Sequence, residues 1–352
     1  MSDFHPNDTH LITGTFLQLD HWDDTEGARF QQQLRAMTPD EWRQMLRDMA
    51  AIGIDTLVIQ QSLDGRGGCR DMRAYYPSRR YPVPGWMRKK PFLYDEIVDE
   101  AELLGMTVLH GICPIHGPDP YRETAEAVAL GTATACELME RYGGRRGFGG
   151  WYWAWEYPPG SVSGRDCLKR IVPEIRRVAD APFMIAPNID RGICAAVLAD
   201  IDVDICAYQD TVGLGVEPDI FGRHARAGRY QSLHRLPVLY EMAKFAHDGW
   251  VANEPTPAEL WNFYRRERGR TALWNDLEIW EFNHKRELLP TELSRVVAQL
   301  ELTAPFVDKQ IIYQYPGLMC HPDHPARVGG ERAVTLYETY ALYRESLLRK
   351  LK

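Results

Sequence analysis

The stretch Thr38–Gln61, TPDEWRQMLRDMAAIGIDTLVIQQ, contains the helix-then-strand unit on which the fold prediction rests. Thr38 stands before Pro, Asp and Glu, and this order is a strong helix start. A threonine caps the first turn, a proline fits its first position, and acids favour the positive end of the helix. We therefore predict a helix over Pro39–Ile52 and a buried strand over Thr56–Gln61.

The same alternation of short apolar strands and amphipathic helices recurs about eight times along the 352 residues. The predicted strands are Leu11–Gln18, Thr56–Gln61, Thr107–Cys113, Gly150–Glu156, Phe183–Asn188, Asp204–Asp210, Ala272–Glu278 and Gln310–Tyr315. The helices predicted after the first are Tyr94–Leu104, Arg122–Tyr142, Gly164–Val178, Ile193–Ala199, Pro257–Arg268, Thr291–Thr303 and Ala333–Leu351. Strict alternation implies a parallel sheet, and eight such units close naturally into a barrel. The expected fold class is α/β, a single (β/α)8 barrel over residues 1–352.

An open doubly wound sheet is the alternative fold, but its usual signature is missing from the sequence. No G-x-G-x-x-G lies between the first strand and the first helix, and the segment GGRRGFGG at 143–150 precedes a strand instead of following one. Two connections are long, namely Ser62–Pro91 after the second strand and Thr211–Thr256 after the sixth. Both would lie at the C-terminal face of the barrel, where long loops are usually functional.

The net charge and the cysteines indicate which binding partners and which cellular compartment to expect for this protein. The net charge of -8 argues against nucleic acid or an anionic membrane as the main partner. No apolar run reaches the roughly 18 residues that span a bilayer, and no secretory signal is visible. The seven cysteines are scattered without C-x-x-C spacing, which favours reduced thiols in a cytoplasmic protein. Whether the chain forms a homo-oligomer stays open.

Polar residues cluster at the predicted C-terminal strand ends, which converge on one pocket in a barrel. These residues are Gln18, Gln61, Glu156, Asn188, Gln209, Asp210, Glu278 and Gln314. One polar strand end would mean little, whereas eight together predict a polar bowl. His110 and His116, on either side of the end of the third strand, are a weaker signal.

Two glutamates stand out because they end the fourth and seventh strands. The alternation of side chains along a strand puts Glu156 on one face with Tyr152, and Glu278 on one face with Trp274 and Asp276. We assign these faces to the interior, because apolar helices cover the outside and a carboxylate there would be costly. The two strands lie roughly opposite one another in a barrel, so the two carboxylates could flank one bond. The alternative for either glutamate is a buried salt bridge to an arginine.

This arrangement is what glycosidic cleavage needs. One carboxylic acid protonates the leaving oxygen, and the second either attacks the anomeric carbon or activates water. We predict a glycoside hydrolase with Glu156 as general acid and Glu278 as nucleophile or base, acting on a saccharide without a cofactor. Asp210 is the third catalytic candidate, since it could hold a sugar hydroxyl, tune a neighbouring pKa or serve as an inverting base. Its alternative role is to cap the turn that ends the sixth strand.

The remaining candidates are expected to bind substrate. Tryptophans beside the acids offer stacking surface for a sugar ring, Asp276 would support Glu278, and the glutamines and Asn188 would bind hydroxyls. The substrate-binding set is Gln18, Gln61, His110, Trp155, Asn188, Gln209, Trp274, Asp276 and Gln314. The basic residues of Ser62–Pro91, Arg66 among them, either favour an anionic saccharide or form a solvated lid held by salt bridges.

Several motifs resemble a bacterial TIM-barrel family that is glycoside-hydrolase-like and mostly catalogued as a domain of unknown function. The motifs that carry the resemblance are Ile12–Gln18 (ITGTFLQ), Glu41-Trp42, Gly53–Gln60 (GIDTLVIQ), Gly150-Trp151-Tyr152 with Glu156, the turn Gln209–Gly213, and Trp274–Glu278. They appear in the family's order and span roughly residues 10–282. The resemblance implies a sugar-active barrel with Glu156 and Glu278 as the acid pair. Trp155 precedes Glu156 where the large retaining clan of barrel glycosidases has asparagine, so retention and inversion both stay open.

Two rival functions remain open at this point. In a metal-dependent sugar isomerase or epimerase, Glu156, Asp210, Glu278 and a histidine would gather a divalent ion. In a carbohydrate-binding barrel without catalysis, the same bowl would hold a sugar and release it unchanged.

Overall fold

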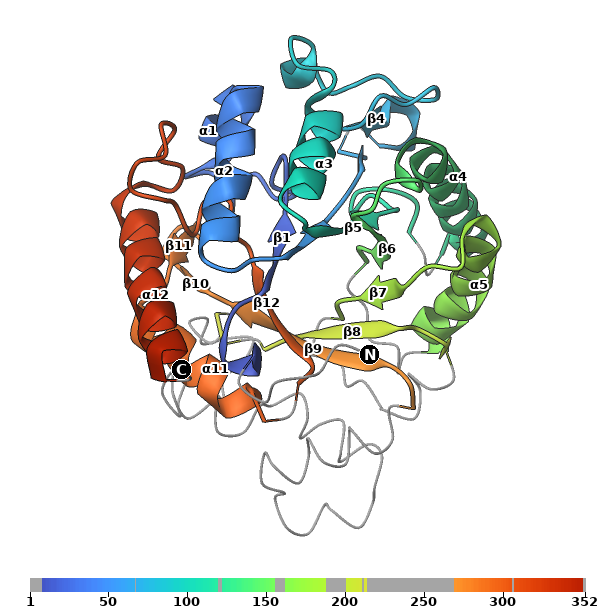
Figure 1. Ribbon diagram of the computed structural model, residues 1–352. Helices are drawn as coiled ribbons and strands as arrows, with labels where there is room; N and C mark the ends of the chain where they lie inside the picture. The colour runs from blue at the N-terminus through green and yellow to red at the C-terminus, as the bar shows by residue number, and fades with distance from the viewer. Residues whose placement is uncertain are drawn as a thin grey trace.

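The computed structural model describes residues 8–66, 68–119, 122–155, 162–187, 201–210, 212–213, 269–305 and 307–350. Parallel strands close into one barrel, which has the strand order β1-β12-β9-β8-β7-β6-β5-β2 (Figure 1). These strands are β1 (Gly14–Leu17), β2 (Thr56–Ile59), β5 (Thr107–Gly111), β6 (Phe148–Trp153), β7 (Phe183–Ile185), β8 (Ile205–Gln209), β9 (Ala272–Glu278) and β12 (Lys309–Tyr313). The predicted (β/α)8 TIM barrel is confirmed.

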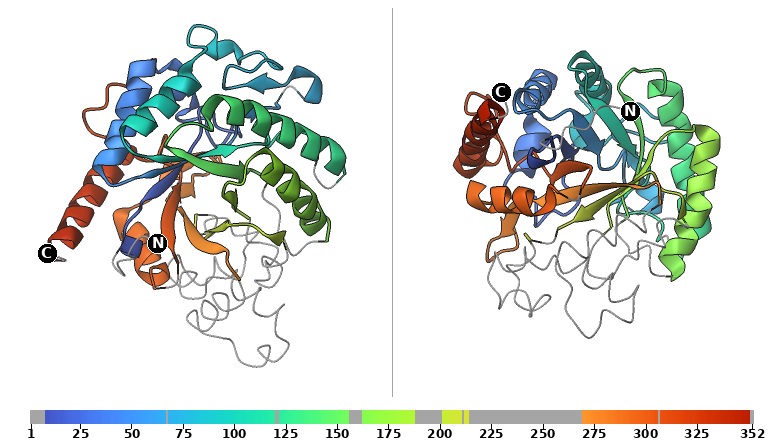
Figure 2. Two further views of the ribbon diagram at one scale, coloured as in Figure 1. Left: turned by 45° about the vertical axis from the view of Figure 1, so that its right-hand side comes forward. Right: turned by 60° about the horizontal axis from the view of Figure 1, so that its bottom comes forward.

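Helices surround the barrel on its outside, as the two further views show (Figure 2). They are α2 (Pro39–Ala51), α3 (Leu93–Leu103), α4 (Thr124–Tyr142), α5 (Val162–Val178), α11 (Leu293–Thr303) and α12 (Gly330–Lys350). The start of α2 is the one that the sequence predicts. The Thr38 hydroxyl accepts the Glu41 N–H at 3.3 Å, and the Glu41 carboxylate accepts the Thr38 N–H at 2.6 Å, which together form a capping box. The helices predicted at Ile193–Ala199 and Pro257–Arg268 lie outside the described residues.

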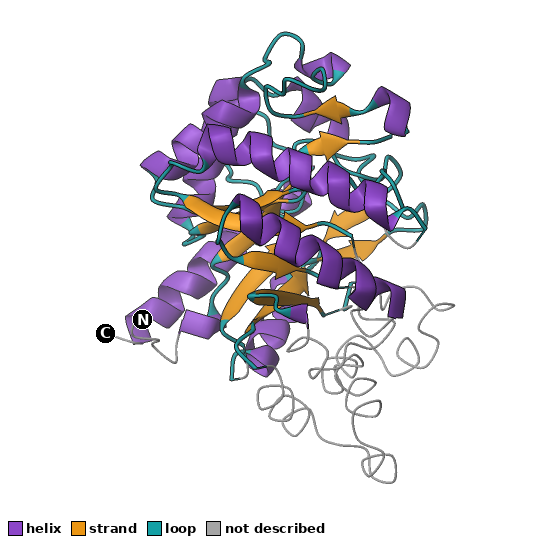
Figure 3. Ribbon diagram, turned by 90° about the vertical axis from the view of Figure 1, so that its right-hand side faces the viewer, coloured by secondary structure: helices purple, strands orange, loops and turns teal. Residues whose placement is uncertain are grey.

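Several short elements escape the sequence analysis. They are α1 (Gln31–Ala36), the antiparallel pair β3 (Leu63–Asp64) and β4 (Arg73–Ala74), and the antiparallel pair β10 (Trp280–Phe282) and β11 (Leu288–Pro290). Figure 3 shows the small β3–β4 pair beyond one end of the barrel. The first long connection, Ser62–Pro91, therefore contains structure of its own, including the 3-10 turns η2 (Cys69–Asp71) and η3 (Gly85–Met87). Most of the second, Thr211–Thr256, lies outside the described residues.

Aromatic contacts identify the face of each strand that points into the barrel. The Phe16 ring of β1 lies 5.2 Å from the Tyr152 ring of β6, and these two strands are not neighbours in the sheet. The two rings therefore meet inside the barrel, and Phe16 also contacts the ring of Tyr313 at 5.8 Å. The strand registers then show which residues of the other strands point inward, because paired residues of neighbouring parallel strands point to the same face of the sheet. The interior positions nearest the C-terminal ends are Gln18, Gln60, Gly111, Ala154, Ala186, Gln209, Glu278 and Tyr313.

The opposite face of each strand packs against the helices and forms the large apolar core. Trp151 and Trp153 have this outward phase and are almost completely buried. Gly131 of α4 accommodates the second of them, since a Cβ there would lie 3.0 Å from the Trp153 ring. Within the described ranges, every helix is too short or too polar to cross a bilayer.

Candidate active site

Glu278 closes β9 on the interior face of the barrel. Asn275, three residues earlier, donates from Nδ2 to the Thr303 hydroxyl of α11 at 3.1 Å, so its side chain points outward. Asp276 and Glu278 alternate with Asn275 and therefore point inward, where Glu278 pairs in register with Tyr313 of β12. Glu278 is only 3% exposed, and Asp276 lies one layer of side chains deeper inside the barrel.

Buried side chains hold the backbone of Glu278 on both sides of its Cα. Its N–H donates to Oδ1 of Asp210 at 3.2 Å. Its carbonyl oxygen accepts from Nη2 of Arg295 at 2.9 Å and from Nε2 of Gln299 at 3.4 Å. Arg295 and Gln299 are fully buried on α11. We call Asp210, Arg295 and Gln299 the Glu278 clamp, because together they fix the direction in which the glutamate leaves the strand.

The carboxylate of Asp210 is engaged by protein donors. Oδ1 accepts the Val212 N–H at 3.2 Å as well as the Glu278 N–H, and Oδ2 accepts Nε2 of Gln299 at 2.6 Å. Burial raises the pKa of Asp210, while these donors and the nearby Arg295 oppose that rise. The contact with Val212 is the turn cap that the sequence left open as its alternative role. The geometry favours this role and the clamp over direct contact with substrate.

Gln18 lies at the end of β1, where the sequence analysis expects it, and its partner is Gln60. Nε2 of Gln18 donates to Oε1 of Gln60, and the two residues stand side by side at the ends of β1 and β2. Gln61 has the outward phase, and its Oε1 accepts the Ile115 N–H at 3.3 Å, so it holds the loop after β5. This outward direction contradicts the prediction of Gln61 as a hydroxyl-binding residue, and the interior position belongs to Gln60. Among the described residues none accepts from Nε2 of Gln60, although the residue is only 1% exposed.

Tyr313 and Trp22 belong to the same end of the barrel, and sequence reasoning missed both. The Tyr313 hydroxyl accepts from Nε2 of Gln18 at 2.5 Å and from Nε1 of Trp22 at 3.0 Å. Nε2 of His21 lies 3.3 Å from the same hydroxyl, and burial lowers the pKa of His21 to about 4. A neutral His21 can accept the Tyr313 proton. The aromatic residue at the end of β12 was the available signal, because Tyr313 has the same register as Glu278.

His110 lies away from this site, which corrects its prediction as a substrate-binding residue. It has the outward phase on β5, and its ring stacks with Tyr94 of α3, with Tyr142 of α4 and with Phe148. Its Nδ1 lies 2.7 Å from the Tyr94 hydroxyl. Burial among these rings lowers the pKa of His110 to about 3.

The neutral His110 has a consequence for stability at acid pH. Its native pKa is below the ordinary 6.5, so its contribution is fully present above pH 6.5 and is lost as the pH falls toward 3. At pH 5 this loss amounts to about 2 kcal/mol. We expect His110→Phe, which keeps a ring at this place, to lose less stability than the parent between pH 7.5 and pH 5. Urea unfolding at both pH values measures the difference, and equal losses in the two proteins would contradict the assignment.

Trp274 points into the barrel but lies at its opposite end, so its prediction as a stacking residue is also corrected. It pairs in register with Lys309, whose Nζ lies 5.7 Å above the Trp274 ring. Lys309 in turn contacts Asp55, which precedes β2, at 2.6 Å. Trp274 therefore belongs to the N-terminal end of β9, two interior layers below Glu278. Trp155 follows β6 and is half-buried against the apolar core.

Of the four remaining residues that the sequence predicts for the site, the structure describes two, Gln209 and Gln314. Gln209 has the interior phase, is paired in register with Asp276, and donates to the Ala186 carbonyl at 3.3 Å. Gln314 follows Tyr313 and is completely buried, with neither amide atom bonded to a described residue. An unsatisfied buried amide costs on the order of 1–3 kcal/mol. Glu156 and Asn188 lie outside the described residues, so their roles stay predictions.

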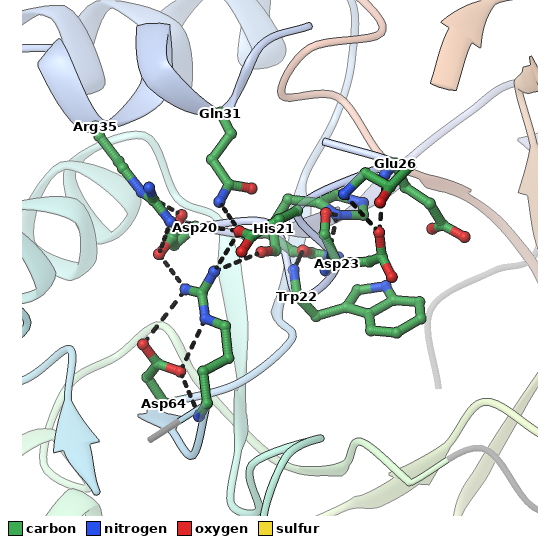
Figure 4. Close-up of polar contacts among 12 residues, drawn as sticks. Asp20, His21, Trp22, Asp23, Glu26, Gln31, Arg35 and Asp64 are labelled. Atoms are coloured by element: carbon green, nitrogen blue, oxygen red, sulfur yellow. Dashed lines mark hydrogen bonds and ion pairs between the residues drawn. The ribbon is translucent and has the colours of Figure 1, made fainter. Parts of the chain in front are cut away.

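The basic loop after β2 uses Arg66 to hold the loop after β1. Arg66 contacts Asp20, and it also contacts Asp24 and Asp64, each at 3.1 Å. Asp20 is almost fully buried and also accepts from Nε of Arg35 at 2.8 Å. Figure 4 shows Arg35 and Asp64 around Asp20, with Trp22 pointing away from them. These contacts favour the salt-bridged interpretation of the basic loop, because three acids already engage Arg66.

Metal ligation was the basis of one rival function. In the part of the chain that the structure describes, His, Cys, Asp and Glu side chains form no group of three that could hold a metal ion. Asp210, one of the expected ligands, accepts from three N–H groups of the protein.

Solved structures share this fold over nearly their whole length. A candidate α-L-fucosidase from Bacteroides thetaiotaomicron has a TM-score of 0.64 and 19% identity, with 98% of each chain covered. A glycoside hydrolase family 5 mannosidase from Rhizomucor miehei has a TM-score of 0.52 and 13% identity, covering 96% of this chain and 93% of that one. An endo-1,4-β-D-mannanase from Thermotoga petrophila has a TM-score of 0.52 and 11% identity, covering 95% and 99%. At these identities the likeness establishes the fold.

The curated proteins include no match to this chain. The model of one protein family, described as a domain of unknown function (DUF4434), matches residues 12–326. This range contains the whole barrel, from before β1 to beyond β12, and all the residues of the candidate site. The chain therefore belongs to the family described as a domain of unknown function (DUF4434).

Proposed function

We propose that this protein is a glycoside hydrolase that cleaves a glycosidic bond in a small oligosaccharide or glycoside. The observation that carries the proposal is the placement of Glu278. Its carboxylate is buried on the interior face, at the C-terminal end of β9, and its backbone is held on both sides. In barrels of this kind the C-terminal end of the strands is where catalytic groups gather. Neighbours of the same fold that are named as a mannosidase and a mannanase support a sugar substrate.

In the proposed reaction Glu156 donates a proton to the leaving oxygen as general acid. Glu278 either attacks the anomeric carbon or takes a proton from the attacking water. The Glu278 clamp contributes by positioning, because a carboxylate that is already oriented needs no reorganisation when charge develops on the sugar. Asp210, Gln299 and Arg295 are thus positioning residues and not catalytic residues in this proposal.

A panel of 4-nitrophenyl glycosides and short oligosaccharides tests the proposed activity. We expect release of a reducing sugar from at least one α-L-fucoside, β-D-mannoside or β-D-galactoside, with turnover unchanged after exhaustive treatment with a chelator. Proton NMR of the first product then distinguishes retention from inversion at the anomeric carbon. Conversion of an aldose to a ketose that depends on an added divalent ion would instead support the isomerase alternative and contradict the hydrolase.

A further inference from the structure

An amide group with an unused donor lies in the interior layer that contains Glu278. Gln60 and Gln18 are joined through Oε1 and Nε2, and Gln18 reaches the Tyr313 hydroxyl at 2.5 Å. The other end of Gln60, its Nε2, has no acceptor among the described residues, and the residue is 1% exposed. Buried donors nearly always have acceptors in folded proteins. An oxygen atom supplied by a ligand would complete this group.

Trp22 is fixed beside that amide group by three hydrogen bonds. Its backbone N–H donates to Oε1 of Gln18 at 3.1 Å, and its carbonyl oxygen lies 2.9 Å from Nε2 of His116. Its indole N–H donates to the Tyr313 hydroxyl at 3.0 Å. All the polar atoms of Trp22 are therefore used, and its ring already contacts the rings of His21 and His116, each at 6.1 Å. What Trp22 can still offer to a ligand is the part of its ring that these two histidines leave uncovered. The ring is half-buried and points away from the Asp20–Arg35 pair (Figure 4).

The four described side chains that meet here carry no positive charge. Gln18, Gln60, Tyr313 and Trp22 are neutral, and the nearby acids of β9 would repel a carboxylate. Arg66, one of the basic residues of the adjoining loop, is engaged by Asp20, Asp24 and Asp64. An apolar ring face beside hydroxyl-binding amides suits a neutral pyranose, which has C–H groups on its faces and hydroxyls on its rim.

We propose that Gln18, Gln60, Tyr313 and Trp22 form a neutral-sugar subsite, in which Nε2 of Gln60 donates to a hydroxyl oxygen and the Trp22 ring covers a face of the same pyranose. The subsite rests on the proposed function for its placement beside Glu278, since Tyr313 and Glu278 are register partners. It goes further by assigning three residues, Gln60, Tyr313 and Trp22, and by selecting uncharged sugars over uronic acids.

Binding of free sugars to the full chain tests the subsite without requiring cleavage. D-galactose, D-mannose, L-fucose and D-galacturonic acid are each titrated into the protein, and NMR measures the affinity of each. The affinities of the three neutral sugars are then compared with that of D-galacturonic acid. We expect at least one neutral sugar to bind, and D-galacturonic acid to bind at least about 10-fold more weakly. Gln60→Leu and Trp22→Leu should each lower the affinity for the neutral sugar by about 10-fold or more. Tyr313→Phe removes the hydroxyl that accepts from the Trp22 indole, and it should lower the affinity for the neutral sugar by a smaller factor.

Gln310→Leu is the matched control for the glutamine variant. Gln310 is also a fully buried glutamine, but it lies on the outward face of β12, where it contacts Thr303 and Asn275. Its loss should lower the midpoint of thermal unfolding and leave sugar affinity within about 2-fold. Equal affinities of the parent and the Gln60 variant, preference for D-galacturonic acid, or no binding of any neutral sugar would each overturn the subsite. Binding of a neutral sugar together with no cleavage of any glycoside or oligosaccharide in the panel would overturn the hydrolase and leave the subsite standing.

Discussion

Replacing Glu278 by glutamine is expected to lower kcat by roughly 10²- to 10⁴-fold while the protein stays folded. The amide has nearly the same shape as the carboxylate, so the buried position at the end of β9 is preserved. An amide can neither attack an anomeric carbon nor take a proton from water at neutral pH. Sugar binding at the neutral-sugar subsite should survive, because that subsite uses other side chains.

Glu281→Gln is the matched control for this variant. Glu281 lies three residues further along the chain on β10, and its half-buried carboxylate pairs with the exposed Arg332 of α12 at 3.0 Å. The same change of charge at this position should leave kcat within about 2-fold, because this pair joins β10 to a helix on the outside of the barrel. Full turnover in Glu278→Gln, or an equal loss in both variants, would remove Glu278 from the reaction.

A smaller side chain at the same position distinguishes the two roles open to Glu278. Glu278→Ala leaves space in which azide, a small anion, can act. If the glutamate is a nucleophile, azide attacks the anomeric carbon in its place, the leaving oxygen takes the proton of the general acid, and a glycosyl azide forms. If the glutamate is a base for water, the parent enzyme inverts the anomeric centre of its product, whereas an enzyme with a nucleophilic glutamate retains it. Mass and NMR analysis of the products measures the difference.

The barrel itself could be predicted from the sequence, because its signals are local and repeated. The capped helix at Thr38 and the alternation of strands and helices are set by residues within a few positions of one another. The elements that were missed, α1, β3–β4 and β10–β11, are each too short to show a period. Their hydrogen bonds depend on the barrel against which they fold, so the local sequence carries little trace of them.

The candidate site was predicted less well, for reasons that lie in the geometry of barrel strands. Both faces of such a strand are buried, so the run TLVIQQ shows no alternation, and its phase could not decide between Gln60 and Gln61. The same uncertainty of phase misplaced His110. Trp274 points into the barrel as predicted, but it lies at the N-terminal end of β9. The alternation of side chains tells which face of the strand a residue occupies and says nothing of its distance from the C-terminal end. On β9 the spacing from Asp276 to Glu278 was read correctly.

Asp210 depends on contacts that no local pattern contains. Its carboxylate meets Gln299, which is 89 residues further along the chain, and the backbone of Glu278, which is 68 residues away. The sequence marked the residue as catalytic because it is an acid at a strand end. The structure shows that three N–H groups of the protein occupy it, which is why we propose a positioning role.

Asp210→Asn is therefore expected to lower kcat by about 10- to 100-fold with little change in KM, because a small displacement of a reacting group is enough to slow catalysis strongly. One oxygen becomes an NH2 group, so either Gln299 or the two backbone N–H groups lose their acceptor. The free energy of unfolding should fall by about 1–3 kcal/mol, the cost of leaving a buried polar group unsatisfied. Steady-state kinetics and urea unfolding on the same protein measure both effects.

Asn275→Leu controls for the loss of stability. Asn275 joins the same strand to the same helix, but its side chain points outward to Thr303 and Gln310. It should lose comparable stability and keep kcat within about 2-fold, since its side chain bonds neither Glu278 nor Asp210 and reaches the clamp only through Thr303, which donates to the backbone carbonyl of Gln299. Equal losses of kcat in the two variants would mean that Asp210 matters only for folding.

Gln299→Leu separates positioning from direct catalysis by Asp210. Gln299 lies on α11, outside the barrel, and among the described residues its side chain reaches the site through Oδ2 of Asp210 and the Glu278 carbonyl. If Asp210 positions Glu278, the Gln299 variant should reproduce part of the loss in kcat, and the double variant should lose less than the product of the two single losses, because both act through one network. If Asp210 itself exchanged a proton with the substrate, Gln299→Leu would leave kcat nearly unchanged while Asp210→Asn abolished it. The double-mutant cycle thus decides whether the acid at the end of β8 acts on the sugar or on the glutamate beside it.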